Sequence, residues 1–462
     1  MTTVTTSSVA ASLAPQRERI ALLDILRGIS IIGIALINVQ FFIMSISRLA
    51  TWQWSQVSIS EGLTRDGLSF FVERQFLSIF TILFGMGLAL QYQRARQANQ
   101  SFTGVAVRRL LALLALGVTH GVLLWYGDIL ALYALLGFIV LAFRNRSPRT
   151  RLVCGLIIFM VPVLLQAFLA LPDPHARAKS LEEMKESIVV ELQKQAKAPS
   201  SRVPTSKTAS DKSPPPSTSP DTQNAKQKAA AMQTMVRLVN FLGDDEKCYR
   251  SGTWGQMVLH RSFYFLIFSP LVGLTDLTWR GLGLMLIGMY MFQRGYFWEA
   301  DPSPRAYKRL VIYSMIPGVI LQAAGVLVHA LGSQTIGTTS LQFICNHLGS
   351  MGMTLGYMGI FVLLCRRPFW QKALRPLVAV GQMSLTNYIS TSFLFGLIFY
   401  GYGLGLIGQV SPAVALVIAL AVLAFLTVFS VCWLKYFQYG PLEWIWRVLT
   451  YLRWLPIRRP AR

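Results

Sequence analysis

Long apolar segments alternate with short polar connections along almost the whole chain. The apolar segments lie at 20–42, 74–91, 107–126, 128–143, 150–171, 256–274, 281–294, 308–331, 338–365, 377–400 and 410–434. A helix needs about 20 apolar residues to cross the hydrocarbon core of a bilayer. The pattern therefore predicts an all-α polytopic membrane protein.

Basic residues decide which segments cross. Short cytoplasmic loops are enriched in Lys and Arg, and such clusters follow the segments that end near 91, 143, 294, 365 and 434. The connections at 126–127, 332–337 and 401–409 contain no Lys or Arg, as expected outside. If both 256–274 and 281–294 crossed, the cluster after Arg294 would fall outside, so we expect one crossing there, with 256–274 re-entrant or interfacial. This predicts about ten transmembrane helices in one bundle, with both termini cytoplasmic.

The same pattern divides the chain into five parts. We expect a cytoplasmic N-terminal tail at 1–19, a five-helix part at 20–172, an extracytoplasmic insertion at 173–255, a second membrane part at 256–440 and a basic cytoplasmic tail at 441–462. The insertion is rich in Ser, Pro, Lys and Ala, a composition typical of low-complexity segments that bury little apolar surface.

Composition supports the membrane assignment. The chain is 53% hydrophobic and 14% charged, and its net charge is +23. The basic residues stand between apolar segments, so the charge indicates orientation in a lipid bilayer and not nucleic-acid binding. Four of the five cysteines fall inside apolar segments, which predicts neither a disulfide framework nor a metal site.

Three polar residues are expected in one outer layer of the membrane. Asn38 stands in the outer third of the first apolar segment, and His120 stands eleven residues after Arg109, or about 16 Å up a helix. Asp128 follows at the outside turn. A histidine oriented by a carboxylate, with an amide to hold an oxyanion, has the parts of an acyl-transfer site. The alternative, also open, is that His120 bonds a neighbouring helix and Asp128 caps the next one.

A second group lies at the cytoplasmic ends of helices. Arg108, Arg109, Arg27 and Asp24 are candidates for binding the phosphates of an acyl donor. Asp24 and Arg27 are three residues apart, so a local ion pair is the competing interpretation, and Arg108 and Arg109 can also snorkel to the membrane surface.

Further polar residues stand inside later apolar segments. Asn346, His347, Ser384 and Asn387 are candidates for a secondary polar layer. Such residues also hold transmembrane helices together by hydrogen bonds, and the sequence leaves both roles open.

Five blocks of the chain resemble the YeiB family of bacterial membrane proteins, also called domain of unknown function 418. They are "LDILRGISIIGIALINV" at 23–39, "FLSIFTILFGMGLAL" at 76–90, "RRLLALLALGVTHGVLLWYGDILALYALLG" at 108–137, "GQMSLTNYISTSFLFGLIFYGYGLGL" at 381–406 and "WLKYFQYGPLEWIWRVLTY" at 433–451. The resemblance covers nearly the whole chain except the insertion, and it implies a bacterial inner (plasma) membrane as the location.

The first block is also similar to the first span of the wider transmembrane acyltransferase superfamily. That resemblance implies a bundle of ten helices that draws an acyl group from cytoplasmic acyl-CoA and delivers it to an extracytoplasmic glycan or lipid-linked sugar. Asp24, Arg27, Gly28 and Asn38 take the places of the superfamily's acidic residue, its "RG" and its terminal Asn or His. Residues 39–75 contain no histidine, so an acyltransferase of this sequence needs another base, and we expect His120.

Two other functions remain open from the sequence. A polar layer at mid-depth and helices interrupted by glycine also suit a transporter or exporter of a small molecule, although the two halves show no internal repeat. A non-catalytic membrane scaffold is the third interpretation. The acceptor, the acyl chain and the oligomeric state are left open.

Overall fold

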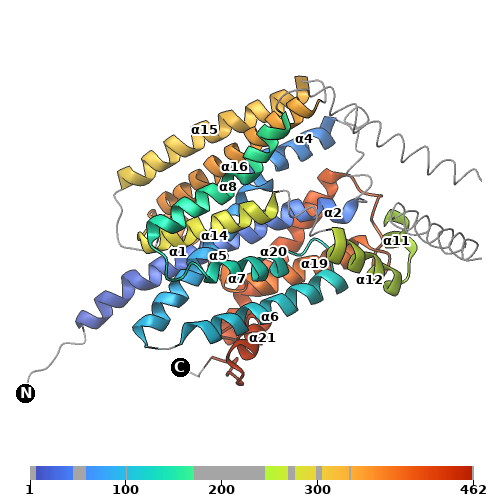
Figure 1. The fold of residues 1–462 in the computed structure, drawn as a ribbon. Coiled ribbons are helices and arrows are strands. Elements are labelled where there is room, and N and C mark those ends of the chain that lie inside the picture. The colour runs from blue at the N-terminus through green and yellow to red at the C-terminus, as the bar shows by residue number, and fades with distance from the viewer. Residues whose placement is uncertain are drawn as a thin grey trace, which may run out of the picture.

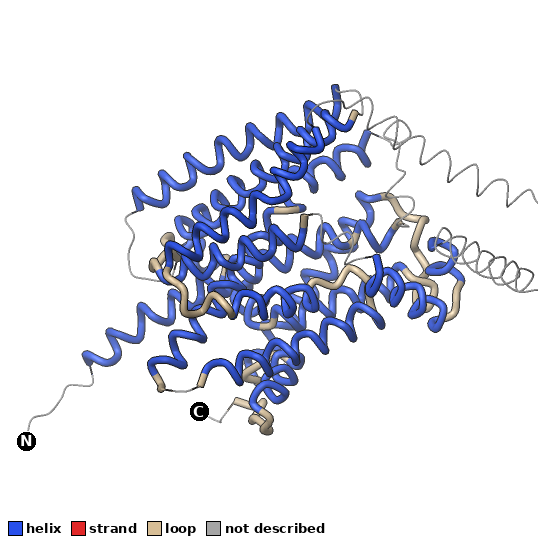
Figure 2. Tube along the Cα trace, in the orientation of Figure 1, coloured by secondary structure: helices blue, strands red, loops and turns tan. Residues whose placement is uncertain are grey.

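The described residues form helices joined by loops, with no strand (Figure 2). The computed structural model describes residues 7–44, 59–99, 101–170, 245–268, 276–297, 304–331 and 335–459, so most of the expected insertion lies outside it. The helices are α1 (Ser7–Asn38), α2 (Gln40–Ile43), α4 (Ile59–Leu68), η2 (Ser69–Glu73), α5 (Gln75–Gln97), α6 (Phe102–Leu123), α7 (Leu130–Leu141), α8 (Pro148–Ala170), α11 (Asp245–Ser251), α12 (Trp254–Phe263), η3 (Tyr264–Phe268), α14 (Leu277–Gln293), α15 (Pro304–Leu331), α16 (Ile336–Cys365), α17 (Pro368–Ala373), α18 (Arg375–Gln382), α19 (Ser384–Phe399), α20 (Pro412–Tyr436) and α21 (Pro441–Tyr451).

Several of these helices are built to cross a membrane. Within the described residues, 7 helical stretches are long and apolar enough: Ala21–Ile43, Asp66–Gln97, Phe102–Leu123, Pro148–Ala170, Pro304–Leu331, Ile336–Cys365 and Pro412–Tyr436. The shorter helices α7, α14 and α19 occupy three more of the predicted apolar segments. The protein is an all-α polytopic membrane protein, as the pattern predicts.

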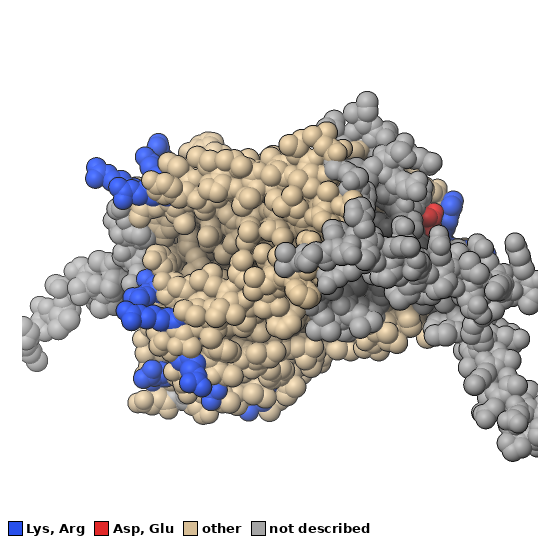
Figure 3. Space-filling view, turned by 45° about the horizontal axis from the view of Figure 1, so that its top comes forward, with Lys and Arg blue, Asp and Glu red and all other residues tan. Residues whose placement is uncertain are grey.

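The outer surface matches a lipid environment. Large apolar side chains such as Ile157, Leu164, Ile320 and Val417 are more than half exposed. In Figure 3, Lys and Arg gather along one edge of the visible face, and a broad band of described residues without charged side chains adjoins them. An apolar belt of this kind is stable in contact with lipid and costly in contact with water.

The helices form one bundle, in which α8, α15 and α16 run together along one side and α6 and α21 lie on the other (Figure 1). The core between them is formed by α1, α5, α7 and α14. The segment 256–294 holds two separate pieces, the short α12 with η3 and the longer α14.

One predicted segment is interrupted. The sequence pattern treats 377–400 as one helix, but the structure ends α18 at Gln382 and begins α19 at Ser384, with Met383 outside helical geometry. The carboxylate of Glu443 accepts the backbone N–H groups of Leu385 and Thr386 at 2.7 and 3.0 Å. A new helix start is therefore capped by a side chain from α21, and hydropathy cannot show this because the partner is remote in sequence.

Two glycines let α1 and α18 approach closely. A side-chain carbon at Gly28 would overlap the carbonyl oxygen of Leu377, and one at Gly381 would overlap that of Asp24. The backbones therefore touch where Asp24 and Gln382 meet. This contact fixes the position of both polar side chains.

Gly381→Ala is expected to destabilise the protein by about 1–3 kcal/mol, because the added methyl group forces the α1 and α18 backbones apart. The measurement is the melting temperature of the purified protein in detergent. Gly67→Ala is the matched control, since nothing lies within 4 Å of a side-chain carbon there. Equal melting temperatures for the two variants would contradict the close approach.

Candidate functional site

His120 and Asp128 form a buried pair where α6 ends and α7 begins. His120 Nδ1 lies 2.8 Å from Asp128 Oδ2. The other carboxylate oxygen, Oδ1, accepts the backbone N–H of Ala131 at 2.8 Å, so Asp128 also caps the start of α7. The exposed fractions are 2% for His120 and 9% for Asp128. Both roles considered for Asp128, cap and orienting group, are thus filled by different oxygens of one carboxylate.

The second ring nitrogen of His120 has no hydrogen-bond partner among the described residues, although it is buried. A carboxylate oxygen only accepts, so Nδ1 carries the proton in this pair. Nε2 of the neutral ring then holds a lone pair. A buried, oriented imidazole with a free lone pair is arranged as a general base is.

Aromatic rings enclose the imidazole. The ring of Tyr388, from α19, lies 5.1 Å from that of His120 between centroids, and the ring of Trp125 lies 6.5 Å away. The backbone N–H of Ile129 donates to the Tyr388 hydroxyl oxygen at 3.3 Å. The Tyr388 proton is not used in that bond and remains able to donate.

A cavity of about 440 Å³ lies within the bundle, and neither His120 nor Asp128 lines it, although Ile129 and Tyr388, which neighbour the pair, do. This volume falls within the range of small-molecule sites, about 300–1,000 Å³. Ile129 and Tyr388 belong to its wall at the His120 end, and Leu83, Phe84 and Leu113 are among its apolar wall residues. Its polar lining residues are Asp24, Arg27, Gln91, Arg109, Gln382, Ser384, Gln438, Glu443 and Arg447.

The polar part of the cavity carries more basic than acidic side chains. Arg27 Nη1 lies 3.0 Å from Asp24 Oδ1, and Gln382 Nε2 donates to Asp24 Oδ2 at 3.2 Å. The Arg109 guanidinium stacks over the Trp446 ring at 3.8 Å, and that of Arg447 lies over Tyr439 at 4.4 Å. Three guanidinium groups against two carboxylates leave this end of the cavity suited to an anionic ligand.

Glu443 is the second of those carboxylates. Burial raises the pKa of its carboxyl, although hydrogen bonds from Thr386 and from the Leu385 backbone act in the opposite direction. Its oxygens are occupied by these contacts, which hold the start of α19 in place. Its role in the cavity wall is to position α19 and therefore Tyr388.

The structure divides the four candidates for binding donor phosphates. Asp24, Arg27 and Arg109 line the cavity, whereas Arg108 does not: its Nε donates to the backbone carbonyl of Thr450 at 3.0 Å. Neighbouring residues on a helix point about 100° apart, so only one of two adjacent arginines faces the bundle. The sequence could not distinguish them.

Within the described part of the chain, no hydrogen bond joins Asn38 to His120 or Asp128. It is half-buried at the end of α1. The following helix, α2, carries Phe42, whose ring stacks on Trp125 at 5.4 Å. Asn38 therefore belongs to the same end of the bundle without touching the histidine.

The four residues expected as a secondary polar layer lie in different environments. Ser384 lines the cavity, and Asn387 donates to Val380 O and Ser430 Oγ, joining α18, α19 and α20. Asn346 packs against Gly325 of α15, and His347 belongs to a separate cluster around Arg280. They do not form one layer, because α16 and α19 lie in different parts of the bundle.

Known proteins resemble this chain along nearly its whole length. It is 30% identical to the uncharacterized protein YxaH of Bacillus subtilis (strain 168), covering 98% of this chain and 100% of that protein. It is 25% identical to the uncharacterized protein YeiB of Escherichia coli (strain K12), covering 94% of this chain and 96% of that protein. Residues 291–453 match the family described as "Protein of unknown function (DUF418)". The chain belongs to this family. No solved structure matches it.

The stretch that matches the DUF418 family contains the site residues that the sequence interpretation missed. Tyr388, Glu443 and Arg447 lie in it and line the cavity. Tyr388 directly follows the polar stretch at 384–387. Glu443 and Arg447 stand in the segment interpreted as a basic tail, where their charge suggested only a cytoplasmic location. Folding of α21 against α6 and α19 brings them into the wall.

Proposed function

We propose that this DUF418 protein is an acyltransferase that takes an acyl group from cytoplasmic acyl-CoA and transfers it to a hydroxyl of an extracytoplasmic cell-envelope acceptor, a glycan or lipid-linked sugar. The observation that carries the proposal is the oriented His120–Asp128 pair with a free Nε2, packed against Tyr388, which lines a cavity whose other end is basic. The base and the anion-binding end of the cavity lie about 16 Å apart along α6. This separation matches acyl-CoA, a donor whose reactive acyl end is distant from its phosphates.

In this mechanism the donor phosphates bind Arg27, Arg109 and Arg447, and the acyl chain lies along the apolar cavity wall. The thioester carbonyl then faces Tyr388, whose hydroxyl proton is free to donate to the oxyanion that develops. Asp24 and Gln382 hold Arg27 in position through the ion pair and hydrogen bond already described.

His120 acts as the general base. Nε2 takes the proton of the acceptor hydroxyl while the hydroxyl oxygen attacks the thioester carbon, and Asp128 stabilises the imidazolium through Nδ1–H. The C–S bond then breaks, and the proton on Nε2 passes to the CoA sulfur. The products are the acyl ester of the acceptor and free CoA.

The mechanism requires the basic end of the cavity to face the cytoplasm. We propose the inner membrane of a bacterium, with both chain termini cytoplasmic. The Lys and Arg clusters at one edge of the belt (Figure 3) and the bacterial sources of the relatives support this placement.

Purified full-length protein in detergent is expected to be stabilised by acetyl-CoA or a longer acyl-CoA. Binding at a hundredfold excess over the dissociation constant contributes about 2.7 kcal/mol, which a thermal-shift measurement detects. Pantetheine, which lacks the phosphates, is the control and is expected to give a smaller shift. No shift with any acyl-CoA would contradict acyl transfer and favour a transporter.

A further inference from the structure

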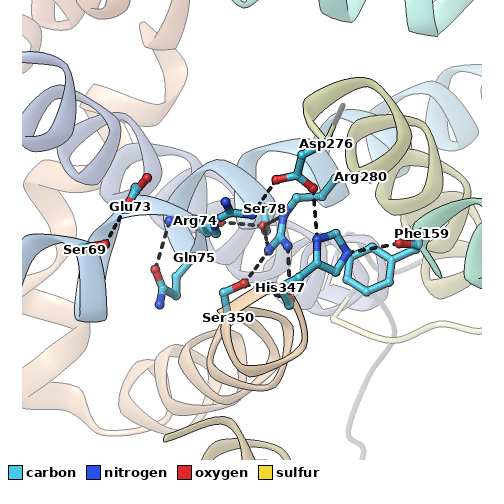
Figure 4. Close-up of polar contacts among 10 residues, drawn as sticks. All are labelled: Ser69, Glu73, Arg74, Gln75, Ser78, Phe159, Asp276, Arg280, His347 and Ser350. Atoms are coloured by element: carbon cyan, nitrogen blue, oxygen red, sulfur yellow. Dashed lines mark hydrogen bonds and ion pairs between the residues drawn. The ribbon is translucent and has the colours of Figure 1, made fainter. Parts of the chain in front are cut away.

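A second polar cluster lies away from the cavity, between α5, α8, α14 and α16 (Figure 4). Its centre is Asp276, which precedes α14, together with Arg74, Arg280 and His347. His347 is fully buried and Arg280 is 4% exposed. Ionisable groups at membrane depth are costly and are retained mainly where they function. None of these residues takes part in the proposed acyl transfer.

An oxygen atom lies close to each ring nitrogen of His347. Nε2 lies 3.1 Å from the backbone carbonyl oxygen of Phe159, and a carbonyl only accepts, so Nε2 carries the ring proton in that bond. Nδ1 lies 3.0 Å from Asp276 Oδ1, at ion-pair distance but without the geometry of a hydrogen bond. In a neutral ring Nδ1 is bare next to this oxygen, whereas one additional proton, on Nδ1 or on the carboxyl, makes the contact favourable.

The charged groups around the pair oppose that proton. Arg74 Nη1 contacts Asp276 Oδ2 at 2.5 Å. Arg280 donates to Ser78, to Ser350 and to the His347 carbonyl, and its guanidinium lies over the Phe159 ring at 5.5 Å. The other titratable groups that act on Arg280 are Glu73, in η2, and Tyr133, in α7.

The Asp276 carboxylate therefore favours the additional proton, and the two guanidinium charges disfavour it. A nearby opposite charge favours the charged form of a buried group and a like charge disfavours it.

The pair is reachable from one side. The side chains of Asp276 and Arg74 are 19% and 27% exposed, whereas that of His347 is 0% exposed. Arg74 precedes α5, and the opposite end of α5 carries the basic residues Arg94 and Arg96. The exposed edge of Asp276 therefore lies in the half of the bundle away from the basic end of α5.

We propose that Asp276 and His347 form a proton-binding site in that outer half, which exchanges one proton with water through the exposed edge of Asp276. The ligand is a proton, and bulk water is its donor and acceptor.

The test is solid-state ¹⁵N NMR of the full-length protein, labelled in histidine, reconstituted in lipid vesicles without CoA and titrated over roughly pH 5 to 8. The His347 signals are those lost in His347→Gln. We expect two protonated ring nitrogens at the acid end and one at the alkaline end. If the proton instead resides on Asp276, an infrared carboxylic-acid band is expected at the acid end that Asp276→Asn removes.

The matched control is His120→Gln, which lies outside the cluster and is expected to leave the His347 signals and their titration unchanged. A His347 ring with one bare nitrogen throughout the titration, together with no carboxylic-acid band, would overturn the proposal. Acyl transfer is not measured in this experiment, so its failure and that of the proposed function are distinguishable.

Discussion

His120→Ala is expected to lower acyl transfer by about 100- to 10,000-fold, the usual contribution of a positioned general base. CoA binding is expected to be unchanged, because the basic residues of the cavity lie about 16 Å away along α6. The measurements are turnover with acyl-CoA, the dissociation constant of CoA, and the melting temperature of the variant.

Asp128→Asn separates orientation from base chemistry. The asparagine oxygen can still accept the Ala131 N–H that caps α7, but its amide group donates toward His120 Nδ1. The ring proton then moves to Nε2, which removes the lone pair. We expect lower turnover with little change in melting temperature. Full turnover of His120→Ala would rule out this histidine as the base, and parallel losses of stability and CoA binding would indicate a packing role.

Arg109→Gln is expected to weaken CoA binding by about tenfold to a hundredfold, because a charge-assisted hydrogen bond contributes about 1.5–3 kcal/mol and each 1.4 kcal/mol is a factor of ten. Turnover at saturating donor is expected to change much less, since the base remains. Titration calorimetry with CoA and steady-state kinetics measure the two quantities.

Arg108→Gln is the matched control for that variant. The two arginines are adjacent and equally charged, but Arg108 bonds the Thr450 carbonyl outside the cavity. We expect its CoA affinity to stay close to that of the wild type. Equal weakening by both variants would mean that general membrane-surface charge, and not the cavity, attracts the donor. Melting temperatures of both variants check for lost stacking on Trp446.

How much of the fold the sequence predicts can be judged from particular helices. The apolar segments coincide with α1, α5, α6, α8, α15, α16 and α20, because hydrophobic length is a local property that the bilayer alone requires. Hydropathy does not predict the interruption at Met383, since the 377–400 segment is apolar on both sides of it. The helix that begins after the interruption is capped by Glu443, which accepts the Leu385 N–H.

The site shows the same division. His120 and Asp128 are eight residues apart, on either side of one turn, so their proximity follows from local chain geometry and was expected. Tyr388 touches His120 from 268 positions away in the sequence, and Arg74 meets Asp276 across 202. The periodicity of a single sequence does not predict contacts between residues so far apart along the chain.

By itself, the sequence determined that this is a helical membrane protein, where its basic ends lie, and which few ionisable groups remain at membrane depth. Hydropathy and charge act on each segment separately, so these properties are readable residue by residue. Only the tertiary structure decided that Arg109 and not Arg108 faces the cavity, and that His347 joins Asp276 and not His120. Those choices depend on how each helix is rotated about its axis and on which helices are its neighbours. Packing sets both, because the helices pack closely in one arrangement, with their small residues in contact.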